Sequence, residues 1–244
     1  MIALKSSDEK YTYEDFLQII RDLRSENGCP WDKVQTHDSL RPCMMEEAAE
    51  LLASIRIYDQ TGNAENMREE LGDVLLQVVM HAQIATEEKL FDMTDVVDEV
   101  SRKMIRRHPH IFGTVKADTP DQVLANWEEI KKEEKKGKDW IKSPLQEIPR
   151  ELPSLTRATK VLKKIDKLYE PGKSYETNVK ELQDCAAKLQ DLSCEEGTEE
   201  LQKVMGDMLL SLSDIARKSK LTAEQILADR IDDLIDDCES RKMP

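Results

Sequence analysis

Apolar residues recur three and four positions apart along most of the chain, with charged residues between them, which is the period of amphipathic α-helices. The first run has Phe16, Ile20 and Leu23 in register behind a Thr12–Asp15 pair, a combination typical of a helix N-terminus. Ser39 is the expected cap of the second helix, which has a proline in its first turn. By the same criteria we expect helices over about 13–26, 40–59, 65–88, 93–108, 120–131, 154–168, 175–192, 198–219 and 222–239.

The composition favours an all-α protein. The 244 residues include only 8 Gly and 9 Pro, while 35% are charged, which argues against sandwiches and barrels. No run approaches the roughly 20 apolar residues that a membrane helix needs, and the N-terminus has no apolar signal core. The five cysteines are odd in number and contain no CxxC pair, as in reduced intracellular thiols. We therefore expect a cytoplasmic protein without membrane contact.

The formal charge of −14 narrows the choice of partners. Nucleic-acid surfaces depend on Lys and Arg that neutralise many phosphates, so an extended nucleic-acid interface is not expected. A small polyanion remains compatible with this charge, because a few local cations, or metal ions held by the acids, can bind it.

The chain contains a diverged internal repeat. Shifting the sequence by 134 residues places 69–76 (EELGDVLL) on 203–210 (KVMGDMLL). A charged run, KKEEKKGKDW, separates the two copies and is typical of a solvated linker. We expect a first domain over 1–138, a linker over 139–150 and a second helical domain over 151–244.

Five acids form the most informative pattern. Glu46, Glu47 and Glu50 project from neighbouring faces of one predicted helix, and Glu70 and Asp73 from the next. A short turn makes these helices antiparallel neighbours, so the two groups can converge among apolar residues. Carboxylates held this close repel one another unless a divalent cation lies between them, and oxygen-only ligands favour Mg²⁺ or Mn²⁺ over zinc.

Two cation pairs follow downstream. Lys103 and Arg107 are one helical turn apart, and Trp127 and Lys131 repeat that spacing on the next predicted helix. Taken alone, each pair fits a charged surface or a packed tryptophan, and Trp31 fits either base stacking or packing.

The acids belong to a longer series of motifs that runs in order over about residues 14–135, comprising Cys29-Pro30-Trp31-Asp32, Gln35-Thr36-His37, Ser39-Leu40-Arg41-Pro42, Glu46-Glu47-x-x-Glu50, Glu70-x-x-Asp73, 106–113 (RRHPHIFG) and 126–131 (NWEEIK). This series resembles the EExxE and ExxD motifs, with their flanking signatures, of MazG-type nucleoside triphosphate pyrophosphohydrolases. The resemblance implies tandem four-helix-bundle domains, a homodimer, and Mg²⁺-dependent hydrolysis of nucleoside triphosphates to monophosphates and pyrophosphate.

The resemblance also implies roles for individual residues. Metal ligands are expected at Glu47, Glu50, Glu70 and Asp73, and Glu46 is the neighbouring acid that orients or deprotonates water. Residues near the triphosphate are expected at Trp31, Lys103, Arg107, Trp127 and Lys131. In this hypothesis metal ions clamp the phosphates, water attacks the α phosphorus, and Lys103 and Arg107 offset charge on the leaving pyrophosphate.

The second copy departs from this pattern. At the shifted positions Glu46, Glu47, Glu50 and Glu70 become Lys180, Glu181, Asp184 and Val204, while Asp73 remains Asp207. With a four-residue shortening, Lys103 and Arg107 fall on Asp233 and Asp237. We therefore expect the second domain to be inactive, with a role in stability, dimerisation or regulation.

Two alternatives stay open at this point. One is a narrower enzyme of the same helical superfamily, such as a dUTP or dCTP pyrophosphatase or a phosphoribosyl-ATP pyrophosphohydrolase, which the early motif around Trp31 disfavours. The other is a non-catalytic interaction module whose acids hold a structural cation, which the intact first set beside an eroded copy disfavours.

Overall fold

The computed structural model describes residues 4–134, 143–169, 172–192 and 198–241, apart from the side chains of Lys132 and Asp191. Over these ranges the chain is entirely helical, as the sequence predicts, with ten α-helices, one 3₁₀ helix (η1) and no strand. The chain divides into two compact units, Met1–Lys135 and Lys136–Pro244, which are described separately. Most of the charged run expected as a linker lies outside the described residues.

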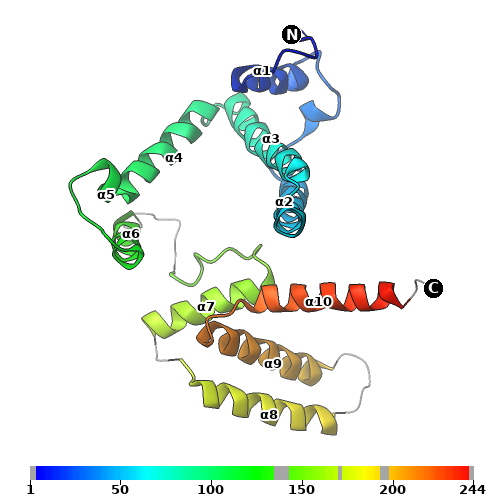
Figure 1. Cartoon of the computed structure of the whole chain (residues 1–244), viewed down its shortest axis with the longest axis vertical. Coiled ribbons are helices and arrows are strands. Elements are labelled where there is room, and N and C mark those ends of the chain that lie inside the picture. The colour runs from blue at the N-terminus through cyan, green and yellow to red at the C-terminus, as the bar shows by residue number, and fades with distance from the viewer. Residues whose placement is uncertain (1–3, 135–142, 170–171, 193–197, 242–244) are drawn as a thin grey trace. The chain divides into compact units, whose positions relative to one another are not determined.

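The described residues of the first unit form seven elements, and Figure 1 labels the six α-helices among them. The seven elements are α1 (Tyr13–Arg24), η1 (Asp32–Val34), α2 (Arg41–Thr61), α3 (Glu65–Glu87), α4 (Met93–Arg107), α5 (Pro109–Phe112) and α6 (Pro120–Glu134).

Local signals in the sequence explain most of the helix ends. Thr12 and Asp15 form the predicted capping box of α1, and Asp92 and Asp95 form the same arrangement at α4. Gly62 closes α2 with φ of 72°, in the left-handed region that glycine adopts without strain. These caps satisfy backbone groups that each helix end would otherwise leave unpaired.

Two local predictions were wrong. Ser39 is not the cap of α2: the N-cap is Leu40, without a side-chain bond, and Ser39 instead exchanges hydrogen bonds with Thr36 in the preceding turn. The loop expected after Pro109 begins with the short helix α5, because proline stops α4 but is well suited to the first position of a new helix.

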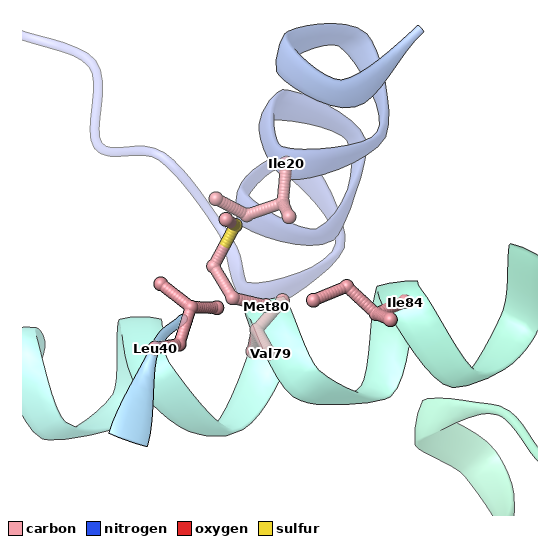
Figure 2. Packing of buried hydrophobic residues seen from close by; sticks show 5 residues of the cluster. All are labelled: Ile20, Leu40, Val79, Met80 and Ile84. Atoms are coloured by element: carbon pink, nitrogen blue, oxygen red, sulfur yellow. The ribbon is translucent and has the colours of Figure 1, made fainter. Parts of the chain in front are cut away.

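The core of the first unit lies where α1 crosses α3. Ile20 from α1 and Leu40 from the segment before α2 pack against Val79, Met80 and Ile84 of α3, and all five are nearly inaccessible to solvent (Figure 2). Met80 extends from α3 toward Ile20 and fills the space between the helices (Figure 2). This packing fixes α3, and α2 lies alongside it (Figure 1). The five predicted acids are divided between these two helices.

The second unit contains α7 (Ser154–Leu168), α8 (Tyr175–Asp191), α9 (Glu199–Lys218) and α10 (Ala223–Ser240). Helices α8 and α9 pair closely (Figure 1) and begin 134 residues after α2 and α3, so the sequence repeat is also a repeat of helices. Residues 143–150 belong to this unit, since Ile148 is buried and Glu147 pairs with Lys164 on α7.

The interior of the second unit is more polar than that of the first. Asn178 on α8 donates a 2.7 Å hydrogen bond to Asp214 on α9, and both side chains are buried. Arg217 and Lys218 also bind Asp214, and Arg217 reaches Asp166 on α7. Burial raises the pKa of Asp214, but these hydrogen bonds outweigh it and hold the pKa below its ordinary value.

The structure bears on two expectations, the absence of a membrane helix and the presence of reduced cysteines. None of the helices in the described ranges is long and apolar enough to cross a membrane. Cys29, Cys43, Cys185 and Cys238 are free thiols, while Cys194 lies outside the described residues.

Candidate metal and phosphate site

Three of the predicted acids converge between α2 and α3. Glu47 on α2 and Glu70 and Asp73 on α3 each place one carboxylate oxygen within 4.8 Å of the others. Each of the three is half-buried. We call these three residues the acid cluster. The convergence follows from the pairing of the two helices, since Glu70 and Asp73 are one turn apart and face α2 together.

The negative charges of the acid cluster and of the neighbouring acids repel one another. Desolvation, followed by the charges of Asp73, Glu50, Glu46 and Glu70, raises the pKa of Glu47 above its ordinary value. A group whose ionised form is disfavoured in this way gains most from a cation placed beside it.

The hydrogen bonding of Glu70 is a second indication that the acid cluster binds a ligand. Its Oε1 accepts a 2.6 Å hydrogen bond from Asn66, one turn earlier on α3. Its Oε2 is buried and has no hydrogen-bond partner. Since buried carboxylate oxygens are normally satisfied, this orphaned oxygen at the acid cluster fits a metal ligand.

The remaining two acids lie at the edge of this group. Glu46 and Glu50 are exposed on α2 and act on Glu47 through their charge, and neither belongs to the three that converge. Glu50 is one turn from Glu47, and it therefore borders the acid cluster on its solvent side.

Large apolar side chains on the two helices that carry the acid cluster are not buried. Leu71 and Leu75 on α3 and Met45 and Leu52 on α2 are exposed, with Leu52 at 69%. Apolar exposure of this kind on adjacent turns of two paired helices marks a surface suited to association.

The predicted cations lie on α4 and on α6, which packs against it: Lys103 and Arg107 are half-buried on α4, and Lys131 is on α6. The Arg107 guanidinium binds Glu134 at 2.6 Å and lies 5.6 Å from the centre of the Trp127 ring, while Lys131 lies 4.2 Å from that centre. The Trp127 Nε1 atom is buried without a partner. The structure thus brings Arg107 and Lys131 together around Trp127, and the carboxylate bound to Arg107 is Glu134 rather than one of the acid cluster.

Glu134 makes a testable contribution to stability. Hydrogen bonds from Arg107 lower its pKa to about 2, and those from Arg106 add to the effect against the cost of burial. Because the folded-state pKa lies below the unfolded value near 4.5, this contribution is present above that value and is lost as the pH falls toward about 2.

We expect Glu134→Gln to lower the free energy of unfolding at about pH 7 by more than it does at about pH 3. Urea denaturation followed by tryptophan fluorescence at both pH values measures the difference. Glu129→Gln, an exposed change on the same helix, should show no such pH dependence. Equal destabilisation by Glu134→Gln at both pH values would contradict the assignment.

The segment 29–37, which carries the Cys29–Asp32 and Gln35–His37 motifs, is held by contacts that local sequence patterns do not indicate. Arg24 at the end of α1 binds Glu87 of α3 at 2.7 Å and donates to the backbone carbonyls of Asp32 and Gln35. His37 stacks on His81 of α3, with the two Nδ1 atoms 2.8 Å apart. These contacts fix the segment that carries Trp31, whose side chain is 60% exposed.

Sequence reasoning missed several residues of this site: Arg24, Asn66, His81 and Glu134. Asn66 could have been found, because it is one turn from Glu70 on the same predicted helix. The others pair with residues 27 to 63 positions away, so no local spacing indicates them.

The shifted positions in the second unit do not rebuild the acid cluster. Glu181 is engaged by Lys173 at 2.7 Å and by the Ser211 hydroxyl, and Val204 is buried where the first unit has Glu70. Within the described residues, the group of acids close enough to hold a metal ion is the one in the first unit.

Comparisons with known proteins agree with the geometry. Residues 35–112, which include the acid cluster and both α4 cations, match the model of the MazG nucleotide pyrophosphohydrolase domain. The chain is 37% identical over 215 residues to the nucleoside triphosphate pyrophosphohydrolase/pyrophosphatase MazG of Thermotoga maritima, which covers 88% of this chain and 79% of that protein.

Two further relatives extend the comparison. The nucleoside triphosphate pyrophosphohydrolase of Escherichia coli K12 is 37% identical over 223 residues, covering 85% of this chain and 78% of that protein. The uncharacterized protein YabN of Bacillus subtilis is 50% identical over 159 residues, covering 64% of this chain and 31% of that protein. The chain therefore spans less than a third of YabN and most of the other two relatives.

Proposed function

Since the chain belongs to the MazG nucleotide pyrophosphohydrolase family, we propose that its first unit hydrolyses nucleoside triphosphates to nucleoside monophosphates and pyrophosphate. The observation that carries the proposal is the acid cluster, with one buried oxygen left without a partner. Relatives named nucleoside triphosphate pyrophosphohydrolases over most of the chain support it.

The residues of the acid cluster fit a hard divalent cation. All the donors are carboxylate oxygens, and the pKa of Glu47 is raised first by burial and then by the neighbouring negative charges, which such an ion would compensate. We propose Mg²⁺, with Mn²⁺ as a substitute, held by Glu47, Glu70 and Asp73, with Glu50 joining from the solvent side. When bound, Mg²⁺ would neutralise phosphate charge and make a bound water more acidic.

The surrounding residues would position the substrate. Glu46 is exposed beside the acid cluster and is proposed to accept the proton of the attacking water. Lys103, Arg107 and Lys131 are proposed to bind the triphosphate and offset the charge that develops on pyrophosphate. Glu134 holds the Arg107 guanidinium in place before substrate arrives, which lowers the entropic cost of binding.

Aromatic side chains are proposed to contact the nucleoside. Trp31 is exposed on a segment fixed by Arg24 and His37, so its ring is available to stack on a base. The Trp127 ring has Arg107 and Lys131 within cation–π distance and is proposed to orient them beside the phosphates.

We also propose that the enzyme is a cytoplasmic homodimer that binds no nucleic acid. The exposed Met45, Leu52, Leu71 and Leu75 on the two helices that carry the acid cluster form a surface that a second copy would cover. The formal charge of −14 disfavours an extended nucleic-acid interface.

The second unit is proposed to be catalytically inactive. It has Val204 in place of Glu70, and Asp233 and Asp237 in place of the α4 cations. A triphosphate at that position would meet negative charge where the first unit offers Lys103 and Arg107.

The proposal is tested by assaying pyrophosphate release from a panel of ribo- and deoxyribonucleoside triphosphates with Mg²⁺ and with EDTA. We expect release that requires the metal. Release from dUTP or dCTP alone would identify the narrower enzyme. Release from no triphosphate would contradict catalysis and favour a helical module with a structural cation.

A further inference from the structure

Gln77 is a buried polar residue that the proposed reaction does not use. It is on α3, its relative exposure is 5%, and its Oε1 atom has no hydrogen-bond partner. Buried carboxamide oxygens are normally hydrogen-bonded, because an acceptor that loses water without gaining a donor destabilises the fold. This oxygen is therefore suited to a donor that arrives with a ligand.

Gln77 lies on the side of α3 that carries the acid cluster. It follows Asp73 by one helical turn and Glu70 by two turns, and side chains at these spacings share a helix face. Glu70 Oε2 and Gln77 Oε1 are both buried acceptors without a partner, and Asp73 lies between them along the helix. One face of α3 thus presents two unsatisfied oxygens on either side of a candidate metal ligand.

The repeat in the second unit shows what a side chain at this position reaches. By the 134-residue shift, Ser211 corresponds to Gln77 and Glu181 corresponds to Glu47. Ser211 is equally buried, at 5%, and its hydroxyl donates a 3.3 Å hydrogen bond to the Glu181 carboxylate. Helices α8 and α9 pair as α2 and α3 do. By this equivalence the side chain of Gln77 faces Glu47 of the acid cluster.

The second unit has lost the unsatisfied oxygens together with the metal ligands. Val204 replaces Glu70. Ser211 replaces Gln77, and its hydroxyl is satisfied by Glu181. Among the residues of the second unit that the structure describes, no buried side-chain nitrogen or oxygen lacks a partner. The unit that keeps the acids is the one that keeps the unsatisfied carboxamide, as expected if this group serves a bound ion rather than the fold.

We propose that Gln77 is a positioning residue for the divalent cation, an inference that rests on the proposed metal site. Its carboxamide oxygen accepts a hydrogen bond from the hydration shell of the ion at the acid cluster. Mg²⁺ keeps several of its water molecules when protein carboxylates bind it, and the hydrogen atoms of that water require acceptors.

The burial of Gln77 places this acceptor at the closed end of the site. Gln77 is more deeply buried than the three half-buried acids, and the core residue Met80 follows it by one turn. A substrate approaches from the solvent side, so the hydration shell of the ion is the source of donors on the core side. Acceptors outside the ligand set fix the position of an ion and raise its affinity.

The binding of Mn²⁺ alone to the full chain without nucleotide tests this role, with free Mn²⁺ counted by electron paramagnetic resonance. Gln77→Met keeps the length of the side chain but removes the oxygen, and we expect it to weaken binding about tenfold. Gln77→Glu keeps an oxygen at this place and should bind Mn²⁺ at least as tightly as the wild type. Gln83→Met is the matched control on α3, where the amide bonds Glu87, and should leave the affinity unchanged.

Urea denaturation of the same variants in EDTA provides a second measurement that does not depend on the metal. A glutamine that serves only the fold would lower stability when replaced. Removal of an unsatisfied buried acceptor has the opposite effect. We therefore expect Gln77→Met to unfold at a higher urea concentration than the wild type, which also shows that this variant is folded.

An unchanged Mn²⁺ affinity in Gln77→Met would overturn the proposal, and so would a lower urea midpoint for this variant in EDTA. Binding by Gln77→Glu as weak as that by Gln77→Met, or an equal loss in Gln83→Met, would also contradict it. Asp73→Asn separates these results from a failure of the metal site itself. If the wild type binds no Mn²⁺, or Asp73→Asn binds it equally well, the proposed function fails first; otherwise only the role of Gln77 is refuted.

Discussion

Asp73→Asn is expected to lower the Mg²⁺-dependent rate of pyrophosphate release by more than about 100-fold. The change keeps the shape of the side chain but removes one of the three converging charges, so the cluster would hold a divalent cation poorly. Steady-state pyrophosphate release over a range of Mg²⁺ concentrations measures both the rate and the metal requirement.

The chain supplies its own matched control for this change. Asp207 occupies the equivalent position 134 residues downstream, on α9, in a unit without a second converging acid group among its described residues. Asp207→Asn should leave the rate within about twofold of wild type. An equal loss in both variants would contradict the assignment of catalysis to the first unit, and full activity in Asp73→Asn would contradict the metal site.

Asp214→Ala is expected to lower the free energy of unfolding of the second unit by about 3 kcal/mol. Asp214 is buried and accepts hydrogen bonds from Asn178, Arg217 and Lys218. Its removal leaves the buried Asn178 amide without this acceptor and takes one of two carboxylate partners from Arg217. Urea denaturation followed by circular dichroism should show an early transition for one unit while the other is little changed.

Asp229→Ala on α10 provides the comparison, because Asp229 is exposed and its hydrogen bond is to Gln225 one turn away. We expect it to change stability by less than about 0.5 kcal/mol. Pyrophosphate release by Asp214→Ala below its first transition should match wild type. Similar destabilisation by both variants would show that the buried network contributes little.

The sequence predicts the helices well because their determinants are local. The Thr12–Asp15 and Asp92–Asp95 boxes and Gly62 act within one turn of the ends that they define. The prediction that Ser39 caps α2 was wrong because the Ser39 hydroxyl bonds the Thr36 backbone in the preceding turn. The identity of the residue does not decide which of these two backbone partners the hydroxyl takes.

The candidate site likewise contains residues that local spacing predicts and residues that it does not. Glu47, Glu70 and Asp73 were predictable, because helical spacing and a short turn bring them together. The Arg24–Glu87 and Arg107–Glu134 pairs were not, since each depends on how two helices pack across a long stretch of chain.

The second unit shows a further limit of sequence comparison. Position by position it looks like an eroded copy, because Val204 replaces Glu70 and Asp233 replaces Lys103. The structure adds that Asn178 and Asp214 are buried and form a connected hydrogen-bond network with the half-buried Arg217 beside a cavity. Such a network is visible only once α8 and α9 are paired in space.

The most direct test of the central claim is the fate of the oxygen atom of water. The wild-type chain is incubated with a triphosphate and Mg²⁺ in ¹⁸O-enriched water, and the products are analysed by mass spectrometry. Attack on the α phosphorus at the acid cluster predicts one ¹⁸O atom in the nucleoside monophosphate and none in the pyrophosphate. Label in the pyrophosphate, or orthophosphate as the released product, would contradict it.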